Sequence, residues 1–350
     1  MDAVEFLQRM LEIESLSGQE GELAEFLVER MAGWGFDAHV DEAGNAVGVM
    51  GDGPNEIVLL GHIDTVPGRI PVRIEDGRLY GRGAVDAKGP LAAFVVATEQ
   101  AGLLPDTRIV VIGATEEEAA TSKGARFAAE RYRPDFCVIG EPSGGDSITL
   151  GYKGRLLIDY QLGRPMGHTA GPQGGVAEEA VAWWQAVSAE ADTFNAGRKG
   201  AFSQLLPSLR GIRTASDGLT DAVEATVGLR LPLDVDVGEL EKTVRELAGE
   251  AQVRCHSYEP AFRASKNTPL VRAFLRAIRA EGGRPTFKLK TGTSDMNVVA
   301  PVWNCPIVAY GPGDSSLDHT PNEHIEAPEY LRAIDVLRRA LNLLTKASNQ

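Results

Sequence analysis

Four short runs of aliphatic and β-branched residues constrain the fold of this 350-residue chain more than any other feature. They are bounded by glycine or polar residues and occupy 57–60 (IVLL), 109–112 (IVVI), 136–139 (FCVI) and 307–310 (IVAY). Continuous apolar runs of this length are typical of strands that are buried on both faces. Helical patterns such as 90–101 lie between the runs, and strand–helix alternation predicts an α/β fold with a mainly parallel sheet.

The middle of the chain has a different pattern. Residues 223–231 alternate between apolar and polar, which predicts a strand with one covered face. Further strand candidates at 156–162 and 251–258, with helix candidates at 175–190 and 237–247, complete two β-α-β halves, as in a small ferredoxin-like α+β unit. The sequence therefore predicts one domain from 1–153 and 262–350, interrupted by an inserted domain at 154–261.

A capping signal near the N-terminus predicts where the second helix begins. Ser17 and Glu20 have the spacing of a capping box, in which each side chain bonds the other residue's backbone N–H. Leu23, Leu27 and Met31 then form an apolar stripe at helical period, and glycine at 33 ends it.

Charge and composition exclude several classes of protein. The chain has 35 basic and 49 acidic residues, a net charge of −14, which argues against nucleic acid or anionic lipid as a partner. No apolar run approaches the roughly 18 residues of a membrane span, and the N-terminus lacks a signal-peptide pattern, so we expect a cytoplasmic protein. The three cysteines are far apart and odd in number, which argues against a disulfide framework.

Candidate metal ligands follow the predicted strands. His62 and Asp64 come after the first run, residues 116–118 (EEE) after the second, Glu141 after the third and His319 after the fourth, while Asp86 lies in a glycine-rich loop. Ligands of α/β proteins bind at the carboxyl ends of the strands, so we expect these groups to converge. Histidine with carboxylates suits zinc or a similar ion, and two histidines with several carboxylates exceed one tetrahedral site. The set therefore predicts a two-metal centre.

Five motifs carry a resemblance to the M20 metallopeptidase and deacylase family. They are 61–67 (GHIDTVP), 81–89 (GRGAVDAKG), 115–118 (TEEE), 140–143 (GEPS) and 318–323 (DHTPNE), and they occur in the family's order. The resemblance implies a zinc-peptidase-like catalytic domain, and it implies that the insert is a lid and dimerisation domain. It thus implies a homodimer, although dimer and tetramer stay open.

The resemblance also implies roles for the candidate ligands. The implied ligands of two divalent ions, zinc with cobalt or manganese as alternatives, are His62, Asp86 as the bridge, Glu118, Glu141 and His319. Asp64 is expected to orient His62 by accepting its other ring N–H, and Glu117 to act as general base. Because three glutamates replace the usual Asp-Glu-Glu, a slip of one, with Glu116 as base and Glu117 as ligand, stays open.

Other motifs point to groups that contact substrate. Residues 166–170 (MGHTA) resemble a lid motif whose histidine stabilises an oxyanion, so His168 is the candidate for that role. The alternative is that His168 is an ordinary polar residue of a loop. Thr293 and Ser294 lie in a loop similar to one that binds a substrate carboxylate, against a simple turn. Arg230 is a second candidate for binding that carboxylate, because arginine binds carboxylates bidentately. The alternative is that Arg230 is simply a solvated residue of its strand.

Within the family, the chain looks most similar to the branch that releases lysine, and sometimes ornithine, from the C-terminal glutamate of a small acidic amino-group carrier protein, LysW. Acetylornithine deacetylase, succinyl-diaminopimelate desuccinylase, a dipeptidase and a non-catalytic binding homologue are the alternatives. Residues 81–83 (GRG) also suggest a dinucleotide-binding enzyme, but the sequence lacks the third glycine of that fingerprint. Two acidic proteins repel each other, so a local basic patch is needed. The candidates for this patch are Lys153, Arg155, Arg164, Arg198, Lys199 and Arg210. The alternative is that these charges are scattered over the surface.

Overall fold

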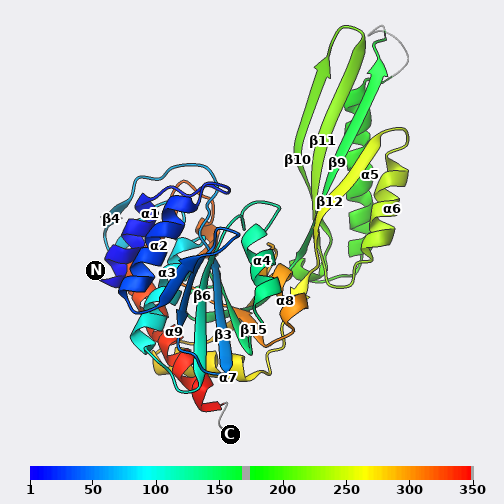
Figure 1. Ribbon diagram of the computed structural model, residues 1–350. Helices are drawn as coiled ribbons and strands as arrows, with labels where there is room; N and C mark the ends of the chain where they lie inside the picture. The colour runs from blue at the N-terminus through cyan, green and yellow to red at the C-terminus, as the bar shows by residue number, and fades with distance from the viewer. Residues whose placement is uncertain (168–173, 348–350) are drawn as a thin grey trace. The chain divides into compact units, whose positions relative to one another are not determined.

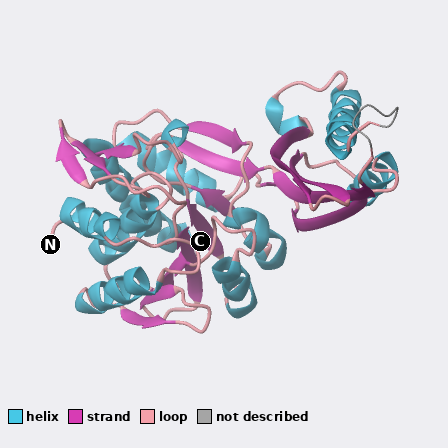
Figure 2. Cartoon of the chain, turned by 90° about the horizontal axis from the view of Figure 1, so that it is seen from above, coloured by secondary structure: helices cyan, strands magenta, loops and turns pink. Residues whose placement is uncertain are grey.

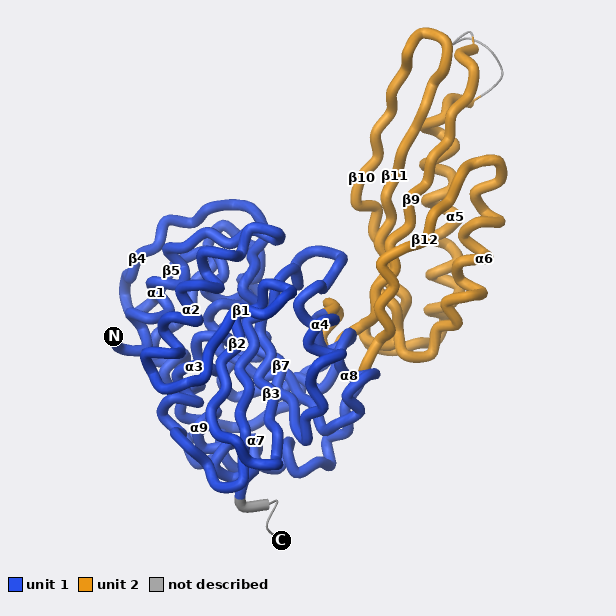
Figure 3. The backbone as a smooth tube through the Cα atoms, viewed as in Figure 1, with its two compact units in different colours: residues 1–151, 263–289, 294–350 blue, residues 152–262, 290–293 orange. Residues whose placement is uncertain are grey.

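The protein divides into two compact units (Figure 3). The computed structural model describes residues 1–167 and 174–347. Unit 1 contains residues 1–151, 263–289 and 294–350, and unit 2 contains residues 152–262 and 290–293. The segment 290–293 is additional to the insert predicted at 154–261. It contacts the start of unit 2, where the Lys153 N–H donates to the Lys290 carbonyl at 3.2 Å.

The core of unit 1 is a largely parallel sheet (Figure 1). Its strand order is β1-β2-β6-β3-β7-β15-β8-β13, and β14 pairs with β8. The strands are β1 (Asp37–Val40), β2 (Ala46–Met50), β3 (Asn55–His62), β6 (Thr107–Ala114), β7 (Phe136–Gly140), β8 (Ser147–Tyr152), β13 (Phe262–Arg263), β14 (Thr286–Lys290) and β15 (Ile307–Ala309). Strand β3 is parallel to both neighbours, β6 and β7, and β7 is parallel to β15, whereas β1, β2 and β8 add antiparallel pairs.

Helices cover both faces of this sheet (Figures 1 and 2). The helices of unit 1 are α1 (Ala3–Glu12), α2 (Gly21–Gly33), α3 (Lys88–Ala101), α4 (Lys123–Arg131), α7 (Pro269–Ala280), α8 (Asp295–Trp303) and α9 (Ala327–Ala347). Helices α3, α7 and α9 pack together over one face, and α4 and α8 pack over the other. The four apolar runs form β3, β6, β7 and β15, which are buried because both faces are covered. The predicted α/β class is confirmed.

Three glycines let helix α3 approach the carboxyl ends of the central strands. Gly61 on β3 pairs in register with Gly113 on β6 and Gly140 on β7. A Cβ at Gly140 would lie 2.9 Å from the Phe94 ring, and a Cβ at Gly113 would lie 3.1 Å from Leu91. The glycine row therefore makes room for α3 where the strands end.

A small sheet, in the order β16-β5-β4, lies beside the loop that carries Asp86. Its strands are β4 (Arg73–Glu75), β5 (Arg78–Tyr80) and β16 (His324–Glu326). Because β16 pairs with β5, the residue before β16, Glu323, is held next to the residues after β5. A short 3₁₀ helix, η2 (Ser315–Leu317), precedes His319.

Unit 2 has the order of elements β9-α5-β10-β11-α6-β12, with the antiparallel sheet order β10-β11-β9-β12. This is the arrangement of a ferredoxin-like unit. Its elements are β9 (Gly154–Pro165), α5 (Val176–Asn195), the 3₁₀ helix η1 (Ala201–Ser203), β10 (Leu206–Ser216), β11 (Thr220–Leu231), α6 (Val237–Leu247) and β12 (Gln252–Glu259). The alternating apolar residues of β11 face α5 and α6. In the described part of the chain, no helix is long and apolar enough to cross a membrane.

The predicted capping box at Ser17 and Glu20 is wrong. Helix α2 begins at Gly21, and Glu20, its N-cap residue, makes no side-chain cap hydrogen bond. The Ser17 hydroxyl instead donates to Asp64 at 2.7 Å, and Glu20 accepts the backbone N–H groups of Gly18 and Glu116. Two residues with a local helix signal serve long-range contacts, because buried groups around Asp64 need partners.

Replacing Phe94 by alanine is expected to lower the free energy of unfolding by about 3–5 kcal/mol, because a fully buried ring between α3 and the sheet is lost. Urea unfolding measures the change. Gln100→Ala, on an exposed position of the same helix, is the matched control and is expected to leave stability almost unchanged. Equal effects of the two substitutions would contradict this packing.

Candidate metal centre

The topology brings three strand ends together. Strand β3 ends at His62 between β6 and β7, and the chain after β6 carries Glu117 and Glu118, while the chain after β7 carries Glu141. Since the three strands are parallel neighbours, their carboxyl ends lie at the same edge of the sheet. Residues about 80 positions apart in the sequence therefore meet at one site.

Asp86 lies between the two predicted histidine ligands. His62 Nε2 is 3.2 Å from Asp86 Oδ1, and His319 Nε2 is 3.1 Å from Asp86 Oδ2. Each carboxylate oxygen thus faces a different histidine. This is the geometry that a bridging carboxylate requires, because one oxygen is directed to each of two sites.

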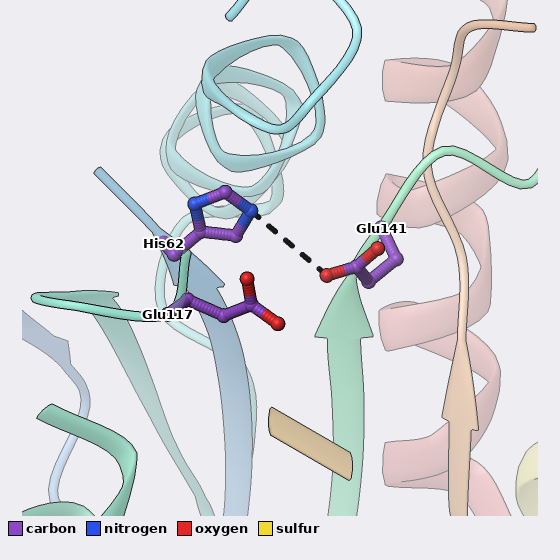
Figure 4. Close-up of side chains that lie close together, drawn as sticks. All are labelled: His62, Glu117 and Glu141. Atoms are coloured by element: carbon purple, nitrogen blue, oxygen red, sulfur yellow. Dashed lines mark ion pairs between the residues drawn. The ribbon is translucent and has the colours of Figure 1, made fainter. Parts of the chain in front are cut away.

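Each histidine also contacts one glutamate. His62 Nε2 is 3.9 Å from Glu141 Oε1, and His319 Nε2 is 2.8 Å from Glu118 Oε1. Figure 4 shows His62 and Glu141 directed toward each other from β3 and from the loop after β7, with Glu117 beside them. Ligand atoms of His62, Glu117 and Glu141 all lie within 4.8 Å of one another, as do those of His62, Asp86 and Glu118.

The three consecutive glutamates point in different directions. The Glu116 side chain accepts a hydrogen bond from the Thr121 hydroxyl at 2.6 Å and lies outside the cluster. Glu117 joins His62 and Glu141, and Glu118 joins His319. Both Glu116 and His319 have a φ of 60°, in the left-handed region that non-glycine residues seldom adopt. This turn of the backbone separates the Glu116 side chain from those of Glu117 and Glu118.

Asp64 holds the loop that carries these glutamates. Its carboxylate accepts the backbone N–H groups of Glu117 and Glu118, each at 3.0 Å, and the Ser17 hydroxyl. His62 Nδ1 lies 3.4 Å from Asp64 Oδ1 and 3.0 Å from the Asp64 carbonyl oxygen. Asp64 therefore contacts the predicted ring nitrogen of His62, and it also positions the neighbouring glutamates.

The pKa values reflect burial of many charges in one place. Burial raises the pKa of Glu117 well above its usual value; His62 opposes this, and Glu141 reinforces it. Burial alone would lower the pKa of His62, but hydrogen bonds to Asp64 and Asp86 raise it well above normal. Hydrogen bonds to Asp86 and Glu118 raise the pKa of His319 to about 10.

This donor set fits metal ions. His62 and Asp64 are fully buried, and Glu141 is 8% exposed, so the carboxylates gather where solvation is poor. Buried like charges are costly unless they are paired or bind metal. Two groups, one of His62, Asp86 and Glu141 and the other of His319, Asp86 and Glu118, each offer imidazole and carboxylate ligands, which suit zinc and similar divalent ions.

Comparison with known proteins identifies the family of the chain. Residues 58–343 match the model of peptidase family M20/M25/M40. The chain belongs to this family. It is a hydrolase of a metal-dependent class, and the sequence-based prediction of an M20 enzyme is confirmed.

Relatives of known name cover nearly the whole M20 chain. It is 49% identical to the "[LysW]-lysine hydrolase" of Deinococcus radiodurans over 98% of this chain and 97% of the relative. It is 27% identical to the "[LysW]-lysine/[LysW]-ornithine hydrolase" of Saccharolobus islandicus over 86% of this chain and 84% of the relative.

Solved structures share the M20 fold. An M20 family metallo-carboxypeptidase from Sulfolobus solfataricus superposes with a TM-score of 0.81 at 18% identity, covering 99% of this chain and all of that one. A dinuclear metal binding M20 peptidase from Bacillus subtilis gives a TM-score of 0.68 at 12% identity over 98% of both chains.

The predicted substrate-binding residues only partly come together. The Arg230 guanidinium donates to the Thr293 hydroxyl at 2.6 Å, and that hydroxyl donates to the Lys153 carbonyl. Ser294 instead caps helix α8, with its side chain accepting the Met296 N–H at 3.2 Å. His168 lies outside the described residues.

Sequence reasoning missed the role of Glu323 in this M20 centre. Its carboxylate is fully buried, and Oε1 accepts the backbone N–H groups of Gly83, Val85 and Asp86 at 2.9–3.1 Å. The other oxygen accepts from Arg82 at 2.7 Å. Glu323 thus fixes the loop that carries Asp86. Its place in the last motif was the available signal, but only the fold shows which loop it contacts.

Glu323→Ala is expected to destabilise the metal-free protein by about 3–5 kcal/mol, because it leaves Arg82 and three N–H groups without their buried partner. Urea unfolding measures this loss, and elemental analysis is expected to show reduced metal content because Asp86 is no longer held. Glu326→Ala, which removes an exposed ion pair with Arg78, is the matched control. Wild-type stability and metal content in Glu323→Ala would contradict this role.

Proposed function

We propose that this M20 enzyme hydrolyses the amide bond that joins lysine, or ornithine, to the C-terminal glutamate of a LysW-type amino-group carrier protein, in lysine or arginine biosynthesis. The observation that carries the proposal is the 49% identity to a [LysW]-lysine hydrolase over 97% of that relative. The clustering of His62 with carboxylates supports the proposal, because a metal ion held there would activate water for attack on an amide.

We propose that two divalent ions, zinc with cobalt or manganese as alternatives, occupy this centre. His62, Asp86 and Glu141 would hold one ion, and His319, Asp86 and Glu118 the other, because each trio contains one histidine and shares Asp86. When bound, the ions supply Lewis acidity, which polarises the scissile carbonyl and lowers the pKa of water.

Glu117 is the proposed general base. Ligand atoms of its carboxylate, of His62 and of Glu141 lie within 4.8 Å of one another, and burial raises the pKa of Glu117. A carboxylate with a raised pKa accepts a proton from water more readily and then delivers it to the departing amine. Asp64 supports this role because it fixes the Glu117 backbone. The direction of the Glu116 side chain argues against the slipped register.

The remaining roles concern the substrate. Arg230 and Thr293, joined by a hydrogen bond in unit 2, are proposed to bind a substrate carboxylate, together with Ser294, which follows Thr293 in the sequence. His168 is proposed to stabilise the oxyanion, on the strength of its motif alone. We also propose a homodimer formed through unit 2, whose edge strand β10 is largely exposed.

Release of lysine tests the proposed function. LysW with lysine on its C-terminal glutamate is incubated with the metal-loaded enzyme, and intact-protein mass spectrometry is expected to show loss of one lysine per carrier. Acetylornithine, succinyl-diaminopimelate and dipeptides are assayed in parallel. Faster turnover of one of these, with the carrier left intact, would overturn the proposal. Tight binding of the carrier without cleavage would indicate a non-catalytic homologue.

Glu117→Gln is expected to reduce kcat by about 10²–10⁴-fold, the usual contribution of a general base, because an amide cannot accept the proton. Elemental analysis is expected to show unchanged metal content. Glu116→Gln is the matched control and is expected to retain turnover. The opposite pattern, with turnover lost in Glu116→Gln and metal lost in Glu117→Gln, would show that the register is slipped by one.

A further inference from the structure

One face of the unit 2 sheet is not covered by the helices of its own unit. Apolar side chains of β9, β11 and β12 pack against α5 and α6. The alternate residues of each strand point to the other side, which we call the open face. Cross-strand register assigns to it Arg155, Asp159, Arg213, Glu224, Thr226, Gly228, Arg230, Arg254 and His256.

Arg210 joins this face through a β-bulge. The register of β10 shifts between Leu209 and Gly211, so Arg210 is the additional residue. A Cβ on Gly228 would lie 2.6 Å from Arg210 Nε, which places the arginine side chain across the glycine. The missing side chain at Gly228 thus lets an exposed arginine lie flat on the open face.

The open face carries an excess of positive charge, whereas the chain as a whole is negatively charged. It carries five arginines, Arg155, Arg210, Arg213, Arg230 and Arg254, against the carboxylates Asp159, Glu224 and the buried Glu259, which is opposite Arg155. The whole chain has 35 basic and 49 acidic residues. A local excess of arginine in such a chain favours contact with negative groups.

Two of these arginines form no ion pair with any residue that the structure describes. Arg213 lies 3.6 Å from Glu224, and Asp159 is shared by Thr226 and His256. Both Arg210 and Arg254 are exposed, and neither has an ion pair within residues 1–167 and 174–347. Elsewhere in unit 2, by contrast, Arg164 pairs with Glu179 and Glu250, and Arg198 pairs with Asp234.

The basic residues on the open face are therefore only partly those predicted from the sequence. Lys153 is buried and donates to the carbonyl groups of Ala201 and Gln204, so it belongs to the interior. The pairs of Arg164 and Arg198 neutralise their charges. Of the six predicted cations, Arg155 and Arg210 lie on the open face, where Arg213, Arg230 and Arg254 join them.

We propose that the open face of unit 2 docks an acidic surface of the carrier protein whose C-terminus supplies the substrate. The proposal rests on the proposed function, since it names where the carrier binds. Arginine binds carboxylates bidentately, and Arg210 and Arg254 are available to do so. Arg230, proposed to bind substrate, lies on the same face, so docking and substrate recognition would use one continuous surface.

The test is the double variant Arg210→Glu, Arg254→Glu, assayed on LysW-lysine and on a peptide of the carrier's last residues with the same scissile bond. At low salt, kcat/KM for the carrier is expected to fall by about 10–10³-fold, the range of electrostatic steering, mainly through KM. Turnover of the peptide is expected to stay within twofold. Added salt is expected to reduce wild-type kcat/KM for the carrier and to leave the variant nearly unaffected.

The matched control is Lys199→Glu, Lys242→Glu, which makes the same change in net charge on exposed residues of unit 2 outside the open face. It is expected to retain most of the carrier activity. Circular dichroism checks the fold, and Arg210→Gln, Arg254→Gln gives a milder version of the same test.

Several outcomes would overturn the docking site. The first is a wild-type kcat/KM for the carrier in the Arg210→Glu, Arg254→Glu variant. The second is an equal loss of kcat/KM in the Lys199→Glu, Lys242→Glu control. The third is a loss of kcat/KM by the arginine variant that is as large for the peptide as for the carrier. A change in oligomeric state without a change in KM would show that the face pairs with a second copy instead. Failure of the wild-type enzyme to release lysine from the carrier would refute the proposed function. Failure of the docking site alone differs, because the wild-type enzyme then still releases lysine.

Discussion

The Asp64 carboxylate is the contact on which the geometry of the centre depends. It lies just after β3, is fully buried, and accepts N–H groups from both Glu117 and Glu118 as well as the Ser17 hydroxyl. Burial would raise its pKa, but hydrogen bonds from His62, Ser17 and the Glu117 backbone lower it, so the group stays ionised. One buried charge thus joins the N-terminal segment to the ends of β3 and β6.

The centre concentrates several negative charges in a small, poorly solvated space. Asp86, Glu117, Glu118 and Glu141 lie around two histidines, and Glu323 adds a further buried carboxylate behind Asp86. Backbone N–H groups and Arg82 satisfy Glu323, whereas Asp86, Glu118 and Glu141 contact the two histidines. Metal ions would stabilise such a cluster, and the chain belongs to a family of metal-dependent hydrolases.

Unit 2 separates two kinds of surface on a single sheet. Its apolar residues face α5 and α6, where arginines such as Arg164 are paired with acids. Its open face instead carries arginines that strand alternation brings together from four strands. This segregation of charge is the basis of the docking proposed for an acidic carrier protein, because a local basic surface offsets the long-range repulsion between two acidic proteins.

The sequence by itself determined the fold class, the family and the candidate ligands. Strands buried on both faces require continuous apolar runs, and metal ligands require particular residue types at strand ends, so both leave local patterns. The structure places His62, Asp86, Glu117, Glu118, Glu141 and His319 at one site.

Only the tertiary structure decided matters that depend on distant partners. Ser17 and Glu20 carried a local helix signal, yet Ser17 donates to the Asp64 carboxylate and Glu20 accepts the Glu116 N–H, because these partly buried polar groups need hydrogen-bond partners. The directions of Glu116 and Glu117 followed from a left-handed φ, and the contact of Glu323 with the Asp86 loop followed from β16 pairing with β5. Which arginines share a face depended on cross-strand register and one bulge, neither of which has a signature in the order of residues alone.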